Sequence, residues 1–87
     1  MDAQYKAAIH VTLKASVLDP QGAAVTKALH ALGYQDVQDV RVGKFIEVAL
    51  AAADETSARD AVARMCEQLL TNPVIESYTY ELTELTV

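Results

Sequence analysis

The sequence predicts a small α+β domain, a ferredoxin-like sandwich in which two helices cover one face of an antiparallel sheet. Two observations support this prediction. Segments in which apolar and polar residues alternate, typical of half-buried strands, are separated by two segments of helical periodicity. Each helical segment has a single apolar stripe, so both helices can pack on the same sheet face. The expected order is β-α-β-α-β, or β-α-β-β-α-β if the middle strand segment folds back on itself.

The first strand is predicted over residues 5–14. Its alternate positions are apolar, and the positions between them are mostly polar or charged. A period of two is the pattern of a strand with one buried face. The inward positions are Tyr5, Ala7, Ile9, Val11 and Leu13.

A helix is predicted next, because its two ends carry clear signals. Asp19 is suited to cap it, Pro20 fits its first turn, and Gly33 is suited to the left-handed residue that follows a helix. Gly22 is unusual, since glycine weakens a helix. Either another backbone approaches closely at Gly22, or the start of the helix is irregular. The apolar stripe comprises Val25, Ala28, Leu29 and Leu32.

The middle segment, residues 37–50, has strand character, but Gly43-Lys44 interrupts it. A two-residue hairpin there would place Val42 and Ile46 on opposite faces, which a sheet with one buried face does not tolerate. A single bent strand keeps them on the same face. A hairpin with a three-residue loop from Gly43 to Phe45 does so too, and both alternatives remain open.

The second helix is predicted over residues 54–70. Asp54 is the expected N-cap, and Asn72-Pro73 ends the helix. Its apolar stripe comprises Ala58, Ala61, Val62, Met65, Cys66 and Leu69.

The last strand is predicted over residues 75–82, with Tyr78 and Tyr80 facing inward. The opposite sheet face combines charged residues with less polar ones, among them His10 and Phe45. This face is less charged than a fully solvated face would be. A contact with another protein and an ordinary wet face are both compatible with it.

Composition limits the classes of function. The chain has 87 residues, so we expect one domain over residues 1–87. Its net charge of −5 disfavours nucleic acid and anionic membranes as partners. No apolar stretch approaches the roughly 20 residues of a membrane span. Residues 1–6 lack the features of a signal peptide, and the single cysteine cannot form an internal disulfide, so we expect a cytoplasmic protein.

No pattern in the sequence predicts an active site. His10 and His30 have no other ligand at metal-binding spacing. Cys66 falls on an apolar stripe, where a cysteine acts as a small buried hydrophobe. Gly43-Lys44 lacks the glycine-rich loop that a phosphate site of the P-loop type needs. Hydrophobic residues make up 52% of the chain, which favours some apolar surface being buried against another subunit.

Three motifs give the chain a family resemblance over nearly its whole length. They are Leu18-Asp19-Pro20-Gln21-Gly22 before the first helix, Val40-Arg41-Val42-Gly43-Lys44 in the middle segment, and Asn72-Pro73-Val74 after the second helix. With these motifs in their expected places, the chain resembles the PurS family, the small subunit of phosphoribosylformylglycinamidine (FGAM) synthase. The resemblance implies the PurS-like form of the α+β sandwich.

The resemblance also implies a function. The family's enzyme makes formylglycinamidine ribonucleotide from formylglycinamide ribonucleotide, ATP and glutamine in purine biosynthesis. A PurQ-type glutaminase subunit releases ammonia, and a PurL-type synthetase subunit binds ATP and magnesium. The small subunit has no catalytic residues and binds no cofactor or metal. It forms dimers or tetramers and bridges the other two subunits, so that ammonia can pass between them.

We expect the partner contacts to involve motif residues that core packing does not require. Gly22 is the clearest example, because a helix start does not favour glycine. Two other functions remain as alternatives: a ferredoxin-like sensor domain that binds a small molecule as a dimer, and a small enzyme that uses Cys66 or His10. The candidate interface residues are Asp19, Pro20, Gln21, Gly22, Arg41, Gly43, Lys44, Asn72 and Pro73.

Overall fold

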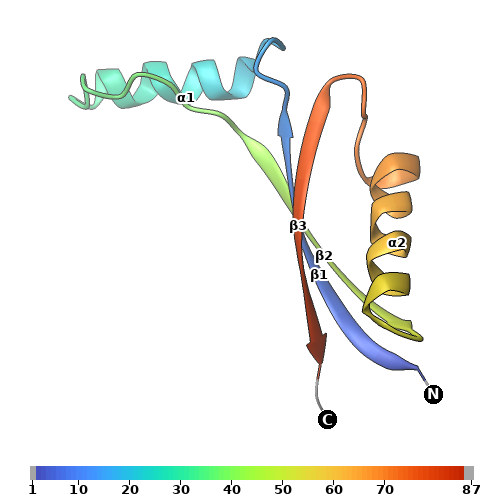
Figure 1. The fold of residues 1–87 in the computed structure, drawn as a ribbon. Helices are drawn as coiled ribbons and strands as arrows, with labels where there is room; N and C mark the ends of the chain where they lie inside the picture. The colour runs from blue at the N-terminus through green and yellow to red at the C-terminus, as the bar shows by residue number, and fades with distance from the viewer. Residues whose placement is uncertain (1, 86–87) are drawn as a thin grey trace.

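The computed structural model describes residues 2–85 and has the order β-α-β-α-β. This confirms the α+β class. The middle segment forms one strand that begins at Gly43, so the hairpin alternative is wrong. Residues 37–42, which we expected to extend this strand, have no regular structure. Figure 1 shows the elements β1 (Ala3–Leu13), α1 (Pro20–Ala31), β2 (Gly43–Ala52), α2 (Glu55–Met65) with its extension η1 (Cys66–Leu70), and β3 (Glu76–Leu85).

The sheet has the order β2-β1-β3, with β1 antiparallel to both neighbours. Ile9 at the centre lies opposite Ile46 on β2 and Tyr80 on β3, so residues of three strands share one apolar row. The alternation predicted for β1 is confirmed, because Ile9 and three other inward positions are buried while the positions between them are mostly exposed. Central placement gives β1 neighbours on both sides, which is why it is the best-buried strand.

The second helix covers the inward face of the sheet, as predicted. Asp54 caps α2 by accepting a hydrogen bond from the backbone N–H of Ser57 at 2.8 Å. Ala58, Val62 and Cys66 have no solvent exposure, and Val62 and Cys66 pack against the β1 core. Each of these three residues lies one turn from the next, as expected for a helix with one buried stripe.

The end of this helix differs from the prediction. Residues 66–70 form a π-helical turn, closed where the Thr71 N–H donates to the Cys66 carbonyl at 3.0 Å. The wider turn shifts the residues that follow it around the helix axis. Leu69, predicted to be inward, is therefore 83% exposed, and Leu70 packs against the core instead.

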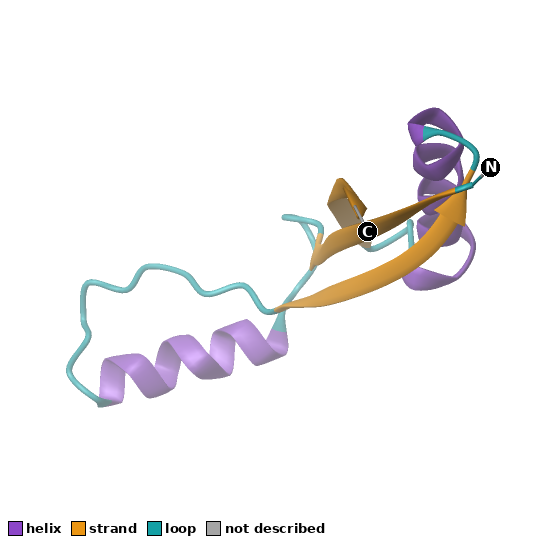
Figure 2. Ribbon diagram, turned by 90° about the horizontal axis from the view of Figure 1, so that it is seen from below, coloured by secondary structure: helices purple, strands orange, loops and turns teal. Residues whose placement is uncertain are grey.

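The first helix does not cover the sheet, and this corrects the prediction of two helices on one face. Figures 1 and 2 show α1 projecting away from the strands on the side opposite α2. Gly22 is the one buried residue that the structure shows in α1, while Val25 is 40% and Leu32 74% exposed. The chain is consequently elongated: its radius of gyration is 17.0 Å, against about 12 Å for a compact domain of this length.

The ends of α1 are as predicted. Asp19 is the N-cap, Pro20 occupies the first turn, and Gly33 beyond the C-terminus has a φ of 104°. Within residues 2–85, no helix is long and apolar enough to cross a membrane.

Candidate functional site

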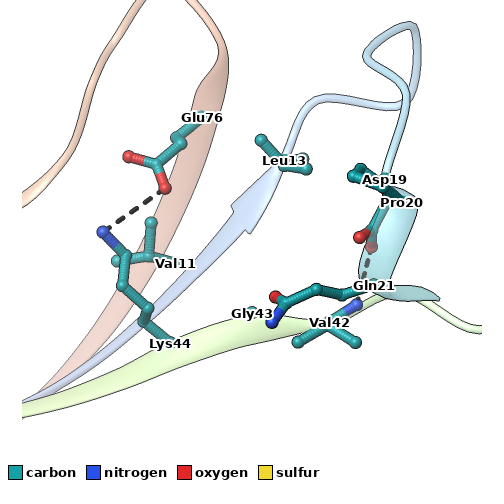
Figure 3. Close-up of a pocket in the computed structure, with 9 residues that line it drawn as sticks. All are labelled: Val11, Leu13, Asp19, Pro20, Gln21, Val42, Gly43, Lys44 and Glu76. Carbon is teal, nitrogen blue, oxygen red and sulfur yellow. Dashed lines mark hydrogen bonds and ion pairs between the residues drawn. The ribbon is translucent and has the colours of Figure 1, made fainter. Parts of the chain in front are cut away.

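Three segments meet at one end of the sheet, and we call this region the junction. It comprises the end of β1 with the start of α1 (residues 13–22), the approach to β2 (residues 40–44) and the approach to β3 (residues 72–76). Figure 3 shows part of it. The nine residues predicted as a partner interface all fall in the junction. Three motifs that are distant in the sequence are thus brought together by the fold.

Asp19 links two of these segments through its carboxylate. Its Oδ1 accepts a hydrogen bond from the Gly22 N–H at 2.9 Å, and its Oδ2 accepts one from the Val42 N–H at 2.8 Å. The residue is only 6% exposed. The hydrogen bond from Gly22, followed by that from Val42, lowers the pKa of Asp19 below its usual value. The side chain is therefore a charged link between α1 and the approach to β2 at neutral pH.

Gly22 is explained by a close approach of the chain. A Cβ atom at this position would lie 2.1 Å from the carbonyl oxygen of Val40. Of the two explanations left open for this glycine, close backbone approach is therefore confirmed. The contact also gives Gly22 a role within its own chain, so its presence in the first turn no longer argues for a partner contact.

Arg41 ties down the loop that joins β1 to α1. One guanidinium nitrogen, Nη2, lies within hydrogen-bonding distance of the carbonyl oxygens of Leu13 (3.3 Å), Lys14 (3.0 Å) and Val17 (3.3 Å). Two residues further along, a Cβ on Gly43 would lie 2.4 Å from the Val11 carbonyl oxygen. The approach to β2 is therefore held closely against the end of β1.

The third motif meets the junction through Glu76. Its carboxylate pairs with Lys44 at 3.4 Å and accepts a hydrogen bond from the Asn72 N–H at 2.7 Å. The bond from Asn72 is the main cause of the lowered pKa of Glu76, with a contribution from Lys44. Glu76 and Lys44 border an open pocket of about 370 Å³. Its lining consists of Val11, Leu13, Asp19, Pro20, Gln21, Val42, Gly43, Lys44 and Glu76 (Figure 3).

The nine predicted residues differ in accessibility. Asp19 and Gly22 are buried within the chain and cannot present a broad contact surface. The exposed members are Pro20, Gln21, Arg41, Gly43, Lys44, Asn72 and Pro73.

Glu76 also belongs to the junction, although it is not among the nine residues predicted from the sequence. It is in phase with Tyr78 and Tyr80, which face inward on the same strand. A charged residue at an inward position is the sequence signal for a polar contact at this end of the sheet. In the structure Glu76 lies on the inward face at the end of the apolar row, where it forms an ion pair with Lys44.

The outward face of the sheet carries a different group of side chains. His10 and Phe45 lie opposite each other on β1 and β2, with ring centroids 4.9 Å apart, and Phe45 is 57% exposed. Lys6 pairs with Glu47 at 2.6 Å further along the same face. The face thus holds an aromatic pair with an exposed Phe45 and, further along, one ion pair.

Of the two residues considered for catalysis, His10 lies against Phe45 on the sheet and Cys66 is buried in the core. Burial, with a smaller effect from Glu67, raises the pKa of the Cys66 thiol and disfavours the nucleophilic thiolate. His30 lies 2.7 Å from the carbonyl oxygen of Val37 through its Nε2, which ties α1 to the following loop. Residues 2–85 contain no group of three or more His, Cys, Asp or Glu side chains that could hold a metal ion.

A family model, curated sequences and solved structures all match this chain to the same protein family. Residues 6–84 match the family model described as PurS, phosphoribosylformylglycinamidine (FGAM) synthase. The FGAM synthase subunit PurS of Synechocystis is 51% identical over 98% of this chain and 85% of its own length. The structure of Bacillus subtilis PurS is 50% identical and superposes with a TM-score of 0.82, covering 92% of this chain and 99% of that one.

A solved assembly also matches. The structure of PurLQS from Thermotoga maritima contains a chain that is 35% identical to this one. The superposition has a TM-score of 0.80 and covers 94% of this chain and 98% of that chain.

Proposed function

The chain belongs to the PurS family of FGAM synthase subunits, and we propose that it bridges a PurL-type synthetase and a PurQ-type glutaminase in purine biosynthesis. The bridge keeps the two active sites close, so that ammonia released by the glutaminase reaches the synthetase before it is diluted or protonated. Proximity of this kind raises the effective concentration of the transferred molecule. ATP and magnesium belong to the synthetase in this proposal, and the assembly is cytoplasmic.

The uncovered first helix supports a role that depends on contacts with other chains. Its apolar stripe, predicted to be buried, has no sheet beneath it in its own chain (Figure 1). A stable helix of this kind normally gains most of its stability by packing its apolar face. The similarity to a chain of the Thermotoga maritima PurLQS assembly supports partners of the PurL and PurQ types.

We also propose that the chain forms a homo-oligomer, dimer or tetramer, in which another copy covers α1. Leu32, 74% exposed at the end of the stripe, is the most sensitive position. A glutamate at Leu32 would bury a charge in such an interface, which is strongly unfavourable. We expect sedimentation velocity to show an oligomer for the unaltered chain and smaller species for Leu32→Glu. Lys27→Glu, on the opposite side of α1, is the control and should leave the oligomer intact; a monomeric unaltered chain would contradict this prediction.

The exposed part of the junction is proposed to contact the partner subunits, with Lys44 as one of its exposed charges. Replacing Lys44 by alanine is expected to weaken the binding free energy for the synthetase by about 1 kcal/mol or more, as is found for the minority of interface residues that contribute most to binding. Lys6→Ala is a matched control. Each of the two lysines pairs with a glutamate of its own on the sheet, but Lys6 lies towards the end of the sheet away from the junction. Equal capture by the two variants would count against a contact at Lys44.

The sensor alternative makes a different prediction, and its readout is simple. A sensor domain would retain a nucleotide or amino acid in equilibrium dialysis of the isolated chain, whereas the bridging subunit is expected to retain neither. The open junction pocket is the place where such a ligand would be sought.

A further inference from the structure

Two loops connect α1 to the sheet, and we infer that Asp19 and Arg41 are positioning residues that lock these loops into an elbow and so fix the direction in which α1 projects. The inference rests on the proposed function in one respect. It assumes that α1 and the sheet both contact other subunits of the proposed FGAM synthase assembly. The elbow itself is a property of the isolated chain.

The direction of α1 is not set by packing on its own sheet. In the described chain α1 lies away from the strands, and its stripe is largely exposed (Figures 1 and 2). It is joined to β1 by residues 14–19 and to β2 by residues 32–42, neither of which has regular secondary structure. Loops of this kind carry conformational entropy, and without cross-links they would allow the helix to take many directions.

The two side chains cross-link the loops reciprocally. Asp19 belongs to the first loop and reaches the second, where its Oδ2 accepts from the Val42 N–H at 2.8 Å. Arg41 belongs to the second loop and reaches the first, where its Nη2 lies 3.0 Å from the Lys14 carbonyl oxygen. Charge-assisted hydrogen bonds of this type are stronger than neutral ones.

The remaining contacts make α1 and the second loop one unit. His30, near the end of the helix, lies 2.7 Å from the Val37 carbonyl oxygen, and Val40 passes directly over Gly22 at its start. In Figures 1 and 2 this loop runs alongside α1 for the length of the helix. A cross-link at the junction therefore orients the whole projecting arm.

The substitution Asp19→Asn distinguishes the two roles of this residue, which are capping α1 and linking the two loops. Asparagine caps helices about as well as aspartate. It has one acceptor oxygen, however, and its amide group cannot accept from both Gly22 and Val42 through separate oxygens as the carboxylate does. Asp54→Asn is the matched control, because Asp54 caps α2 through Ser57 alone and α2 packs on the sheet.

The test is a spin-label distance measurement on the full chain. Labels are placed at Lys27→Cys on α1 and Glu81→Cys on β3, two exposed positions. All variants, the parent included, carry Cys66→Ala and also Leu32→Glu, so that no second copy holds α1 in place. Labelled chain is diluted with unlabelled chain so that only distances within one copy are detected. Circular dichroism establishes that each variant is folded.

We expect one narrow distance distribution for the parent and for Asp54→Asn. The distribution should widen for Asp19→Asn and widen further for Asp19→Asn combined with Arg41→Gln. An unchanged distribution in the double variant would overturn the elbow, whatever the function of the chain.

Binding to the synthetase, measured on the same variants, tests the second half of the inference. Loss of preorganisation should weaken binding about tenfold in the variants with a widened distribution. Asp54→Asn should bind as the parent does. A widened distribution with undiminished binding would show that the direction of α1 is not used in that contact, and would overturn the positioning role while leaving the proposed bridge to its own tests.

Discussion

Replacing Gly22 by alanine should destabilise the folded chain by about 2 to 3 kcal/mol, the cost of overpacking a tightly filled site. In most helices the same change is stabilising by about 0.5 to 1 kcal/mol, because alanine is the better helix former. Here the added Cβ would lie 2.1 Å from the Val40 carbonyl oxygen and 2.7 Å from Asp19 Oδ2. The backbone oxygen has little freedom to retreat, because the nearby Val42 N–H is bonded to Asp19.

Urea unfolding followed by circular dichroism measures this effect, at one chain concentration because an oligomer's stability depends on it. Gln21→Ala is the control, since residue 21 is exposed in the same helical turn and is replaced by the same good helix former without the clash. A Gly22→Ala chain that is as stable as the unaltered one would show that Val40 does not lie where the structure places it.

The strands were predictable from the sequence because their signal is local. Along β1 the alternation of apolar and polar residues directly gives the buried face, and Ile9 and Val11 are buried as expected. The helix caps were predictable for the same reason, since Asp19 and Asp54 bond to backbone groups only three residues away. Local patterns therefore predicted the number and order of the elements and the N-caps of both helices, whereas the start of β2 lies six residues later than predicted.

The position of α1 was not predictable, because an apolar stripe shows that a face is suited to burial but does not show what buries it. The stripe containing Val25 and Leu32 is compatible with the chain's own sheet and with another copy. The π-helical turn was missed for a related reason. Its closing bonds run from Thr71 to the Cys66 carbonyl, and the resulting exposure of Leu69 follows from geometry that a regular helical period does not anticipate.

For the junction, the sequence predicted which residues matter but not the contacts that they make. The sequence singled out its nine residues and identified Gly22 as a position where another backbone approaches closely or the helix is irregular. It could not show that the approaching residue is Val40, or that Arg41 bonds to carbonyls of the loop after β1. These contacts join segments distant in the chain and are visible only once the fold is known.

Removal of this chain from the assembly is expected to have the largest functional effect. The proposed bridge acts on ammonia transfer and not on the chemistry of the synthetase. Ammonium salts supply ammonia from solution and bypass the glutaminase. Loss of the chain should therefore abolish the glutamine-dependent reaction and leave the ammonium-dependent one.

The most direct test is to mix PurL-type synthetase and PurQ-type glutaminase subunits with and without this chain, and to measure formation of formylglycinamidine ribonucleotide from each nitrogen source. We predict that glutamine supports the reaction only when this chain is present, while ammonium salts support it in both mixtures. Equal glutamine-dependent rates with and without the chain would contradict the bridging role.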